Sequence, residues 1–163
     1  MMKTKSMMML SWSLLLILPF LLLPAHGMSE EHPEVPESLP GVVIIGAEQL
    51  LAMVESGQSL IIDSRKPSDF KIGSVPGAIN CPVTSGNHSL DKDEVAQTAT
   101  DIKNCSDGII TADRAKTVAT FCNGLRCWRS PKLAIALKHL GFVHVHWYRL
   151  GMNDWKSKGL PME

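Results

Sequence analysis

An excess of charge of either sign is missing from this sequence of 163 residues, in which 16 Lys and Arg balance 16 Asp and Glu. The chain has no run of basic residues and no interleaving of basic with aromatic residues. Proteins that bind nucleic acid need such a cationic footprint to contact the phosphate backbone. We therefore expect no nucleic-acid partner. Internal repeats are absent as well.

The one long apolar run lies at the N-terminus, where Met7–Leu23 follows two lysines. Pro19 interrupts the run, and Ala25 and Gly27 supply small residues where a signal peptidase reads. The pattern predicts a signal peptide over 1–27, cleaved after Gly27, and a periplasmic or secreted protein. The alternative is a transmembrane anchor, because the run is nearly long enough to span a bilayer. No cysteine follows the cut, so we expect no lipid anchor and no stable membrane anchor after cleavage.

Removal of 27 residues from 163 leaves 136, and loss of two lysines gives the mature chain a charge of −2. A chain of that size forms one domain with a proper core. The sequence has only four cysteines, and an oxidising compartment allows them to pair. Three pairings are open, and the sequence alone does not choose among them.

Helical and strand patterns alternate along the mature chain. Residues 28–41 hold four prolines and glycines among acids, which predicts an extended, mobile leader. The region 42–163 then alternates short apolar strands with helices of about a dozen residues, which predicts an α/β fold. We expect a central parallel sheet of about five strands with helices on both faces, a three-layer arrangement. The expected strands are 42–45, 59–65, a short one within 71–83, 116–121 and 142–149, and the expected helices are 46–57, 90–104 and one with Ser130 as N-cap and Pro131 as first residue.

The stretch FCNGLRCWRS (121–130) carries the candidate chemistry. Cys122 is expected at the carboxyl end of a strand, before a loop and a helix N-terminus, where α/β proteins bind ligands. Loop N–H groups and the helix dipole attract anions there and lower the pKa of a thiol, which favours the nucleophilic thiolate. The turn needs the freedom of a glycine, and arginines add permanent positive charge. The candidate anion-binding residues are Asn123, Gly124, Leu125, Arg126 and Arg129.

Three blocks in this order resemble the rhodanese domain over about residues 42–163. They are IIDSRKPSDFKIGSVPGAINCP (61–82), the FCNGLRCWRS loop, and GFVHVHWYRLGMNDWKSKGLP (141–161). The matching positions are Asp63, Arg65, Phe70, Gly73, Pro76, Gly77, Ala78, Gly151, Trp155, Gly159 and Pro161.

The resemblance implies a rhodanese-like three-layer fold and a sulfurtransferase with Cys122 as its nucleophile. Cys122 would take sulfane sulfur from a small anionic donor such as thiosulfate, hold it as a persulfide and pass it to cyanide or a thiol. A thioredoxin-like protein could supply that thiol. The loop amides would stabilise the charge on the terminal sulfur. The resemblance implies no cofactor and no metal.

Three features depart from the family pattern. Ser74 replaces the usual histidine, which we interpret as a structural change, and Leu150 replaces the first glycine of a closing Gly-Gly. If the helix begins at Ser130, Arg129 takes the place of the family's arginine and the loop is two residues longer than in typical sulfur carriers. If the helix begins near Cys127, Arg126 takes that place in a loop of ordinary length. Phosphatase-like relatives have a loop one residue longer, and loop size is thought to set which anion fits.

Cys127 followed by tryptophan resembles a subset of exported rhodanese-like proteins with a Cys-Trp motif. A second thiol there could resolve a Cys122 persulfide, or the pair could cycle as a disulfide. The alternative is a half-buried cysteine without chemistry. Two hypotheses follow: an exported single-domain sulfurtransferase, which we favour, and a redox or binding module that uses a Cys122–Cys127 disulfide. A phosphatase-like activity ranks third, since no acid is positioned to protonate a leaving group.

The remaining candidates have structural interpretations. Cys81 and Cys105 could form a stabilising disulfide or stay free, and zinc held by all four cysteines is not expected. Asp63 and Arg65 could touch substrate, but we interpret them as a buried pair that ties the strand end to the active loop. His144 and His146 could bind a metal, but two histidines on one strand face are more often packed or partly exposed side chains without a ligand. Trp128 could shape the mouth of the site.

Overall fold

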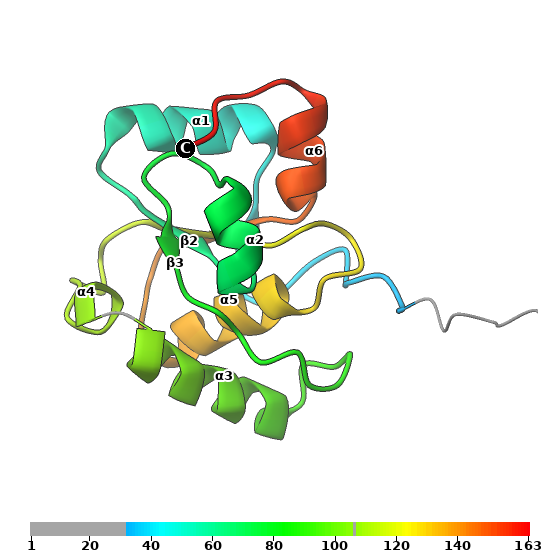
Figure 1. The fold of residues 1–163 in the computed structure, drawn as a ribbon. Helices are drawn as coiled ribbons and strands as arrows, with labels where there is room; N and C mark the ends of the chain where they lie inside the picture. The colour runs from blue at the N-terminus through cyan, green and yellow to red at the C-terminus, as the bar shows by residue number, and fades with distance from the viewer. Residues whose placement is uncertain (1–31, 106) are drawn as a thin grey trace, which may run out of the picture. The chain divides into compact units, whose positions relative to one another are not determined.

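The computed structural model describes residues 32–105 and 107–163 (Figure 1). The strands are β1 (Val43–Ile44), β2 (Leu60–Asp63), β3 (Ile79–Asn80), β4 (Val118–Phe121) and β5 (Val145–Tyr148). The helices are α1 (Ala47–Ser56), α2 (Pro67–Ile72), α3 (Lys92–Cys105), α4 (Asp107–Ile110), α5 (Arg129–His139) and α6 (Gly151–Ser157). The predicted signal peptide and the leader up to residue 31 lie outside the described residues. Within the described ranges, no helix is long and apolar enough to cross a membrane.

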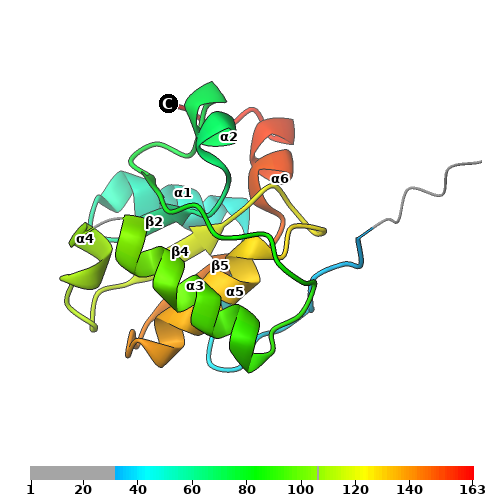
Figure 2. The ribbon, with the colours of Figure 1, turned by 60° about the horizontal axis from the view of Figure 1, so that its bottom comes forward.

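The five strands form one parallel sheet in the order β1-β5-β4-β2-β3, which confirms the predicted fold class. Helices α3 and α5 lie on one side of the sheet, and α1 and α6 lie on the other (Figure 1 and Figure 2). β4 is the middle strand, and all four of its residues are buried because it has a paired neighbour at each edge and helices over both faces.

Alternate residues of β2, β4 and β5 pack in two separate hydrophobic clusters, as the two-residue period of a strand requires. On β4, Val118 packs with the α3 and α5 side of the core, whereas Ala119 and Phe121 pack with the α1 and α6 side. β5 divides its residues in the same way, with Trp147 on the first side and Tyr148 on the second. Both faces of the central strands are therefore apolar, which explains their continuous hydrophobic sequence.

Short helices and the start of α5 differ from the sequence-based expectations. Three helices, α2, α4 and α6, were not predicted, and each has seven residues or fewer. α5 begins at Arg129 with Trp128 as its N-cap, so the prediction of Ser130 as N-cap is wrong. The Ser130 hydroxyl instead accepts a 2.9 Å hydrogen bond from the buried Trp147 indole, which fixes α5 against β5.

The N-terminal strap, residues 32–41, differs from the expectation of a mobile leader. Val35 and Leu39 are buried in the core next to α5, and the strap has no regular secondary structure. The guanidinium of Arg149 donates to the carbonyl oxygens of Pro36 (2.8 Å) and Val35 (2.9 Å). Two apolar anchors and a forked donor therefore hold this part of the leader against the domain.

Candidate active site

Cys122 directly follows the last residue of β4, at the carboxyl end of the central strand. Residues 122–128, which we call the Cys122 loop, connect β4 to α5. The whole Cys122 residue is only 1 % exposed. The sequence predicted that Cys122 lies at the end of a buried strand, and the structure agrees. Ligands bind at this edge of the sheet in α/β folds.

The Cys122 loop is the longer of the two alternatives considered from the sequence. Since α5 begins at Arg129, six residues separate this arginine from Cys122. A helix that begins near Cys127 is excluded, and Arg126 lies within the loop rather than at the start of the helix.

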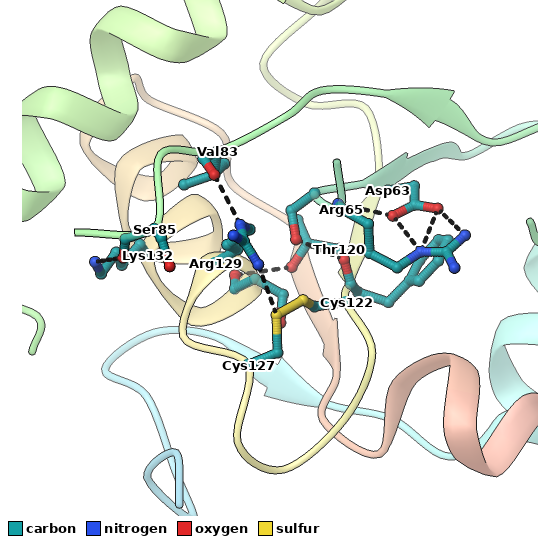
Figure 3. The surroundings of a disulfide bond; sticks show 12 residues. Asp63, Arg65, Val83, Ser85, Thr120, Cys122, Cys127, Arg129 and Lys132 are labelled. Carbon is teal, nitrogen blue, oxygen red and sulfur yellow. Dashed lines mark hydrogen bonds and ion pairs between the residues drawn. A yellow bond between two sulfur atoms is a disulfide. The ribbon is translucent and has the colours of Figure 1, made fainter. Parts of the chain in front are cut away.

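A disulfide joins Cys122 and Cys127 across the loop (Figure 3). Their Cα atoms are 6.2 Å apart, within the range that a disulfide spans. A turn brings the second cysteine back, because the Cys127 N–H donates to the Gly124 carbonyl oxygen at 2.9 Å. The redox hypothesis predicted this bond, and the site is in its oxidised state.

The N-terminus of α6 fixes the backbone of the Cys122 loop. The N–H of Met152 donates to the carbonyl oxygen of Cys122, and the N–H of Asn153 to that of Asn123, both at 2.9 Å. Gly151 makes this approach possible. A Cβ on Gly151 would lie 2.9 Å from the carbonyl carbon of Asn123 and would collide with the Cys122 carbonyl oxygen, and its φ of +60° also favours glycine. The second glycine of the closing motif thus has a steric role.

The strap holds the other side of the loop. The Val35 N–H donates to the Leu125 carbonyl oxygen at 2.7 Å, and the Trp128 indole donates to the Pro33 carbonyl oxygen at 2.9 Å. Sequence reasoning missed these contacts, for which the only signal is two apolar residues, Val35 and Leu39, in a proline-rich segment. The loop is therefore held between α6 and the strap.

A pocket of about 710 Å³ opens at the loop. All five candidate anion-binding residues line it, together with Cys127 and Trp128. Trp128 therefore borders the site, as expected. Sequence reasoning missed other lining residues from distant segments: His32, Lys66, His88 and Asn153. The rings of His32 and His88 lie 4.1 Å apart, so the strap and the segment after β3 meet at this pocket.

Arg129 contacts the disulfide directly. Its Nη1 lies 3.9 Å from the Cys127 Sγ, while its Nε donates to the Val83 carbonyl oxygen at 3.0 Å (Figure 3). The backbone contact orients the guanidinium, and the sulfur contact places its charge at the redox centre. A fixed cation of this kind favours a thiolate or a bound anion.

Asp63 and Arg65 form a buried ion pair with two Nε contacts and one Nη2 contact of 2.6 to 3.0 Å. Arg65 also donates to the Gly73 carbonyl oxygen, and the Ser74 hydroxyl donates to Asp63 at 2.7 Å. The pair is buried, as expected, but its hydrogen bonds tie β2 to the turn after α2 rather than to the active loop. Ser74 thus completes the buried network from the position of the family's histidine.

Asp154 is an acid at the pocket, but its environment keeps it ionised. Hydrogen bonds from the Tyr148 hydroxyl, at 2.6 Å, and from Lys158 lower the pKa of Asp154, against a smaller opposing effect of burial. Burial and the same carboxylate raise the pKa of Tyr148. A carboxylate held in this form is poorly suited to protonate a leaving group, so this acid does not support the phosphatase alternative.

Cys81, Cys105, His144 and His146 do not join the site. Cys81 and Cys105 form a second disulfide with Cα atoms 5.0 Å apart, which confirms that alternative and leaves no thiolate for zinc among the described residues. His144 precedes β5 and is exposed. His146 is half-buried, and burial, followed by His144, lowers its pKa. No cluster of metal-binding side chains occurs within 32–105 and 107–163.

Comparison with known proteins supports the same fold. The family model described as "Rhodanese-like domain" matches residues 46–158. Among curated proteins, an HTH-type transcriptional regulator of Mycobacterium tuberculosis is 26% identical over 115 residues, which are 71% of this chain and 42% of the relative. The chain therefore spans less than half the length of that relative.

Solved structures with the same fold include the BH2092 protein from Bacillus halodurans, at a TM-score of 0.56 and 19% identity, covering 74% of this chain and 76% of that one. The Alr3790 protein from Anabaena sp. aligns at 0.54 and 21%, covering 73% and 79%. A thiosulfate sulfurtransferase from Pseudomonas aeruginosa aligns at 0.50 and 23%, covering 75% of this chain and 20% of that one. At these identities the structural likeness concerns the fold.

Proposed function

The chain belongs to the rhodanese-like domain family, and we propose that it is an exported sulfurtransferase in which Cys122 carries sulfane sulfur. The proposal rests on the position of Cys122. This residue lies at the end of the central strand, at the start of a loop whose pocket is lined by Arg126 and Arg129. In the reduced state, the Cys122 thiolate attacks the outer sulfur of thiosulfate. The products are a Cys122 persulfide and sulfite, and no redox partner is needed for this step.

Two fates are open to the persulfide. An acceptor such as cyanide can take the outer sulfur and regenerate the Cys122 thiolate. Alternatively, the Cys127 thiolate attacks the inner sulfur, forms the Cys122–Cys127 disulfide and releases hydrosulfide. The second route ends in the bond present in the structure. A dithiol, for example on a thioredoxin-like protein, would then reduce the disulfide and start the next cycle.

The test uses reduced protein incubated with thiosulfate, followed by intact mass measurement, peptide mapping and thiocyanate detection after addition of cyanide. We expect a gain of one sulfur atom on Cys122, and loss of both adduct and thiocyanate in Cys122→Ser. In Cys127→Ser the adduct should persist, whereas in the unmodified protein it should decay to the disulfide with release of hydrosulfide. Absence of both adduct and thiocyanate from the reduced unmodified protein would contradict the proposal.

The Cys122–Cys127 disulfide also favours a second function, a thiol–disulfide exchange module. Such a module would exchange electrons with a partner dithiol and carry no sulfur. Reversible oxidation by a thioredoxin-like disulfide, with no sulfur adduct from any sulfane donor, would support it over the sulfurtransferase.

A further inference from the structure

The two sulfurs of the Cys122–Cys127 disulfide differ in their access to solvent. Cys122 is 1 % exposed and does not line the pocket at the loop. Cys127 is half-buried and does line it. Thiol–disulfide exchange requires the incoming thiolate to touch the sulfur that it attacks, so access helps decide which sulfur reacts. A nucleophile in this pocket meets Cys127.

The charges of the pocket select the nucleophile. Lys66 and Arg129 line it, and Arg129 Nη1 lies 3.9 Å from the Cys127 Sγ. The acids on the same pocket, Glu34 and Asp154, are each paired with a cation outside the pocket lining. Their negative charge is therefore offset locally, and the cations of the wall attract anions.

Arg129 also acts in the opposite sense, because a cation beside Cys127 stabilises that sulfur as a departing thiolate. This effect would favour attack on Cys122. That attack requires a nucleophile to reach the Cys122 sulfur, but Cys122 is only 1 % exposed and does not line the pocket. Access therefore outweighs leaving-group stability while the loop keeps this conformation.

We propose that Cys127 is the sulfur at which the oxidised site reacts, and that its substrates are anionic sulfur nucleophiles. A thiolate forms a mixed disulfide with the Cys127 Sγ, the Cys122–Cys127 bond breaks, and its electron pair leaves on the Cys122 thiolate. Hydrosulfide reacts in the same way and leaves a persulfide on Cys127. The disulfide is the oxidant in both cases. The oxidised protein thus captures hydrosulfide directly, and the same step releases the Cys122 nucleophile.

This inference goes beyond thiosulfate turnover and does not depend on it. A protein that never forms a Cys122 persulfide from thiosulfate would still open at Cys127. Failure of the proposed function and failure of this inference are therefore distinguishable, because the first concerns the reduced protein and the second the oxidised one.

The sequence permits a direct assignment of the reactive sulfur. Trypsin cleavage after Lys116, Arg126 and Arg129 separates TVATFCNGLR, which holds Cys122, from CWR, which holds Cys127. The purified oxidised protein is mixed with glutathione, quenched with acid at successive times, alkylated at low pH and digested under mildly acidic conditions. Early samples should carry glutathione on the Cys127 peptide and the alkyl group on the Cys122 peptide, with at least about a tenfold preference for this arrangement. Glutathione mainly on the Cys122 peptide, or equally on both, would overturn the proposal.

Two further arms test the substrate class. With sodium hydrosulfide, the Cys127 peptide should gain one sulfur atom beneath the alkyl group; a gain confined to the Cys122 peptide would contradict the proposal. The matched thiols 3-mercaptopropionate and cysteamine differ in charge. After correction for thiolate fraction, the anionic thiol should open the bond about tenfold faster at low salt. Equal rates would refute selection of anions. The Cys81–Cys105 disulfide is an internal control in every sample, because it also joins a buried cysteine to a half-buried one, and it should open more slowly because Cys105 does not line the cationic pocket.

Discussion

Replacement of Gly151 by alanine should destabilise the protein through a collision with the Cys122 loop. Gly151 has a φ of +60°, a conformation that costs an L-residue about 1–2 kcal/mol. The added Cβ would also lie within 3.0 Å of the carbonyl carbons of Cys122 and Asn123. Relief of that contact requires α6 and the loop to separate, which weakens two backbone hydrogen bonds worth about 0.5–1.5 kcal/mol each. The expected loss of unfolding free energy is about 2–5 kcal/mol.

Gly159→Ala is the matched control for this steric effect. Gly159 has a φ of +63°, and a Cβ added there would meet nothing within 4 Å, so its substitution should carry only the backbone cost of about 1–2 kcal/mol. Both variants lose the same unfolded-state entropy, which cancels in the comparison. Urea unfolding of the oxidised protein, followed by far-UV circular dichroism, measures both. The difference should be about 1–3 kcal/mol, and sulfur transfer should fall only in Gly151→Ala. Equal stability losses in the two variants would refute the steric argument.

Two other predictions concern segments that support the pocket. The double variant Cys81→Ser/Cys105→Ser removes the disulfide that closes a loop with a separation of 24 residues. Its unfolding free energy should fall by about 3 kcal/mol, while exchange at Cys127 should be unchanged. An unaltered urea midpoint would contradict this prediction. Hydrogen bonds to Glu94, first from Lys132 and then from the Asn87 N–H, lower the pKa of Glu94. The Glu94 carboxylate therefore stabilises the fold at pH values above its ordinary pKa. This contribution is lost as the pH falls through the pKa of Glu94 in the folded protein. Glu94→Gln should be much less stable than the unmodified protein at pH 7, because it leaves the buried Lys132 without its acid. The variant should lose less stability on acidification, and a second change, Lys132→Met, should partly restore its stability at pH 7. Equal pH dependence of the thermal midpoint in the variant and the unmodified protein would refute this assignment.

The sequence predicted the layers of the fold because the two strand faces and the helix faces follow local periodicity. Val95 and Ile102 recur at helical spacing on α3, and both are buried in the core. The strand order, in contrast, could not be predicted from local sequence patterns. Nothing local distinguishes β1 beside β5 from other arrangements of parallel strands, since each is a short apolar run.

The parts of the site that the sequence did not predict depend on contacts between distant residues. α6 has only seven residues, too few for a clear period, and it is held by the Cys122 and Asn123 carbonyl oxygens. The strap looks disordered by composition, yet Arg149, more than a hundred positions away, fixes it. Cys122 and its arginines could be found because their chemistry is visible in residue type, whereas Lys66 and His88 reach the pocket only through the fold.

The length of the Cys122 loop bears on which ligand fits. Two extra residues could in principle enlarge the anion site, and loop size is thought to set which anion fits. In the structure the loop turns back through the Gly124–Cys127 hydrogen bond and places Cys127 on Cys122. The added length therefore accommodates a second sulfur in front of the nucleophile rather than a wider cradle. A loop built in this way suits chemistry in which sulfur atoms are exchanged, and it gives the site an oxidised state that a single-cysteine loop lacks.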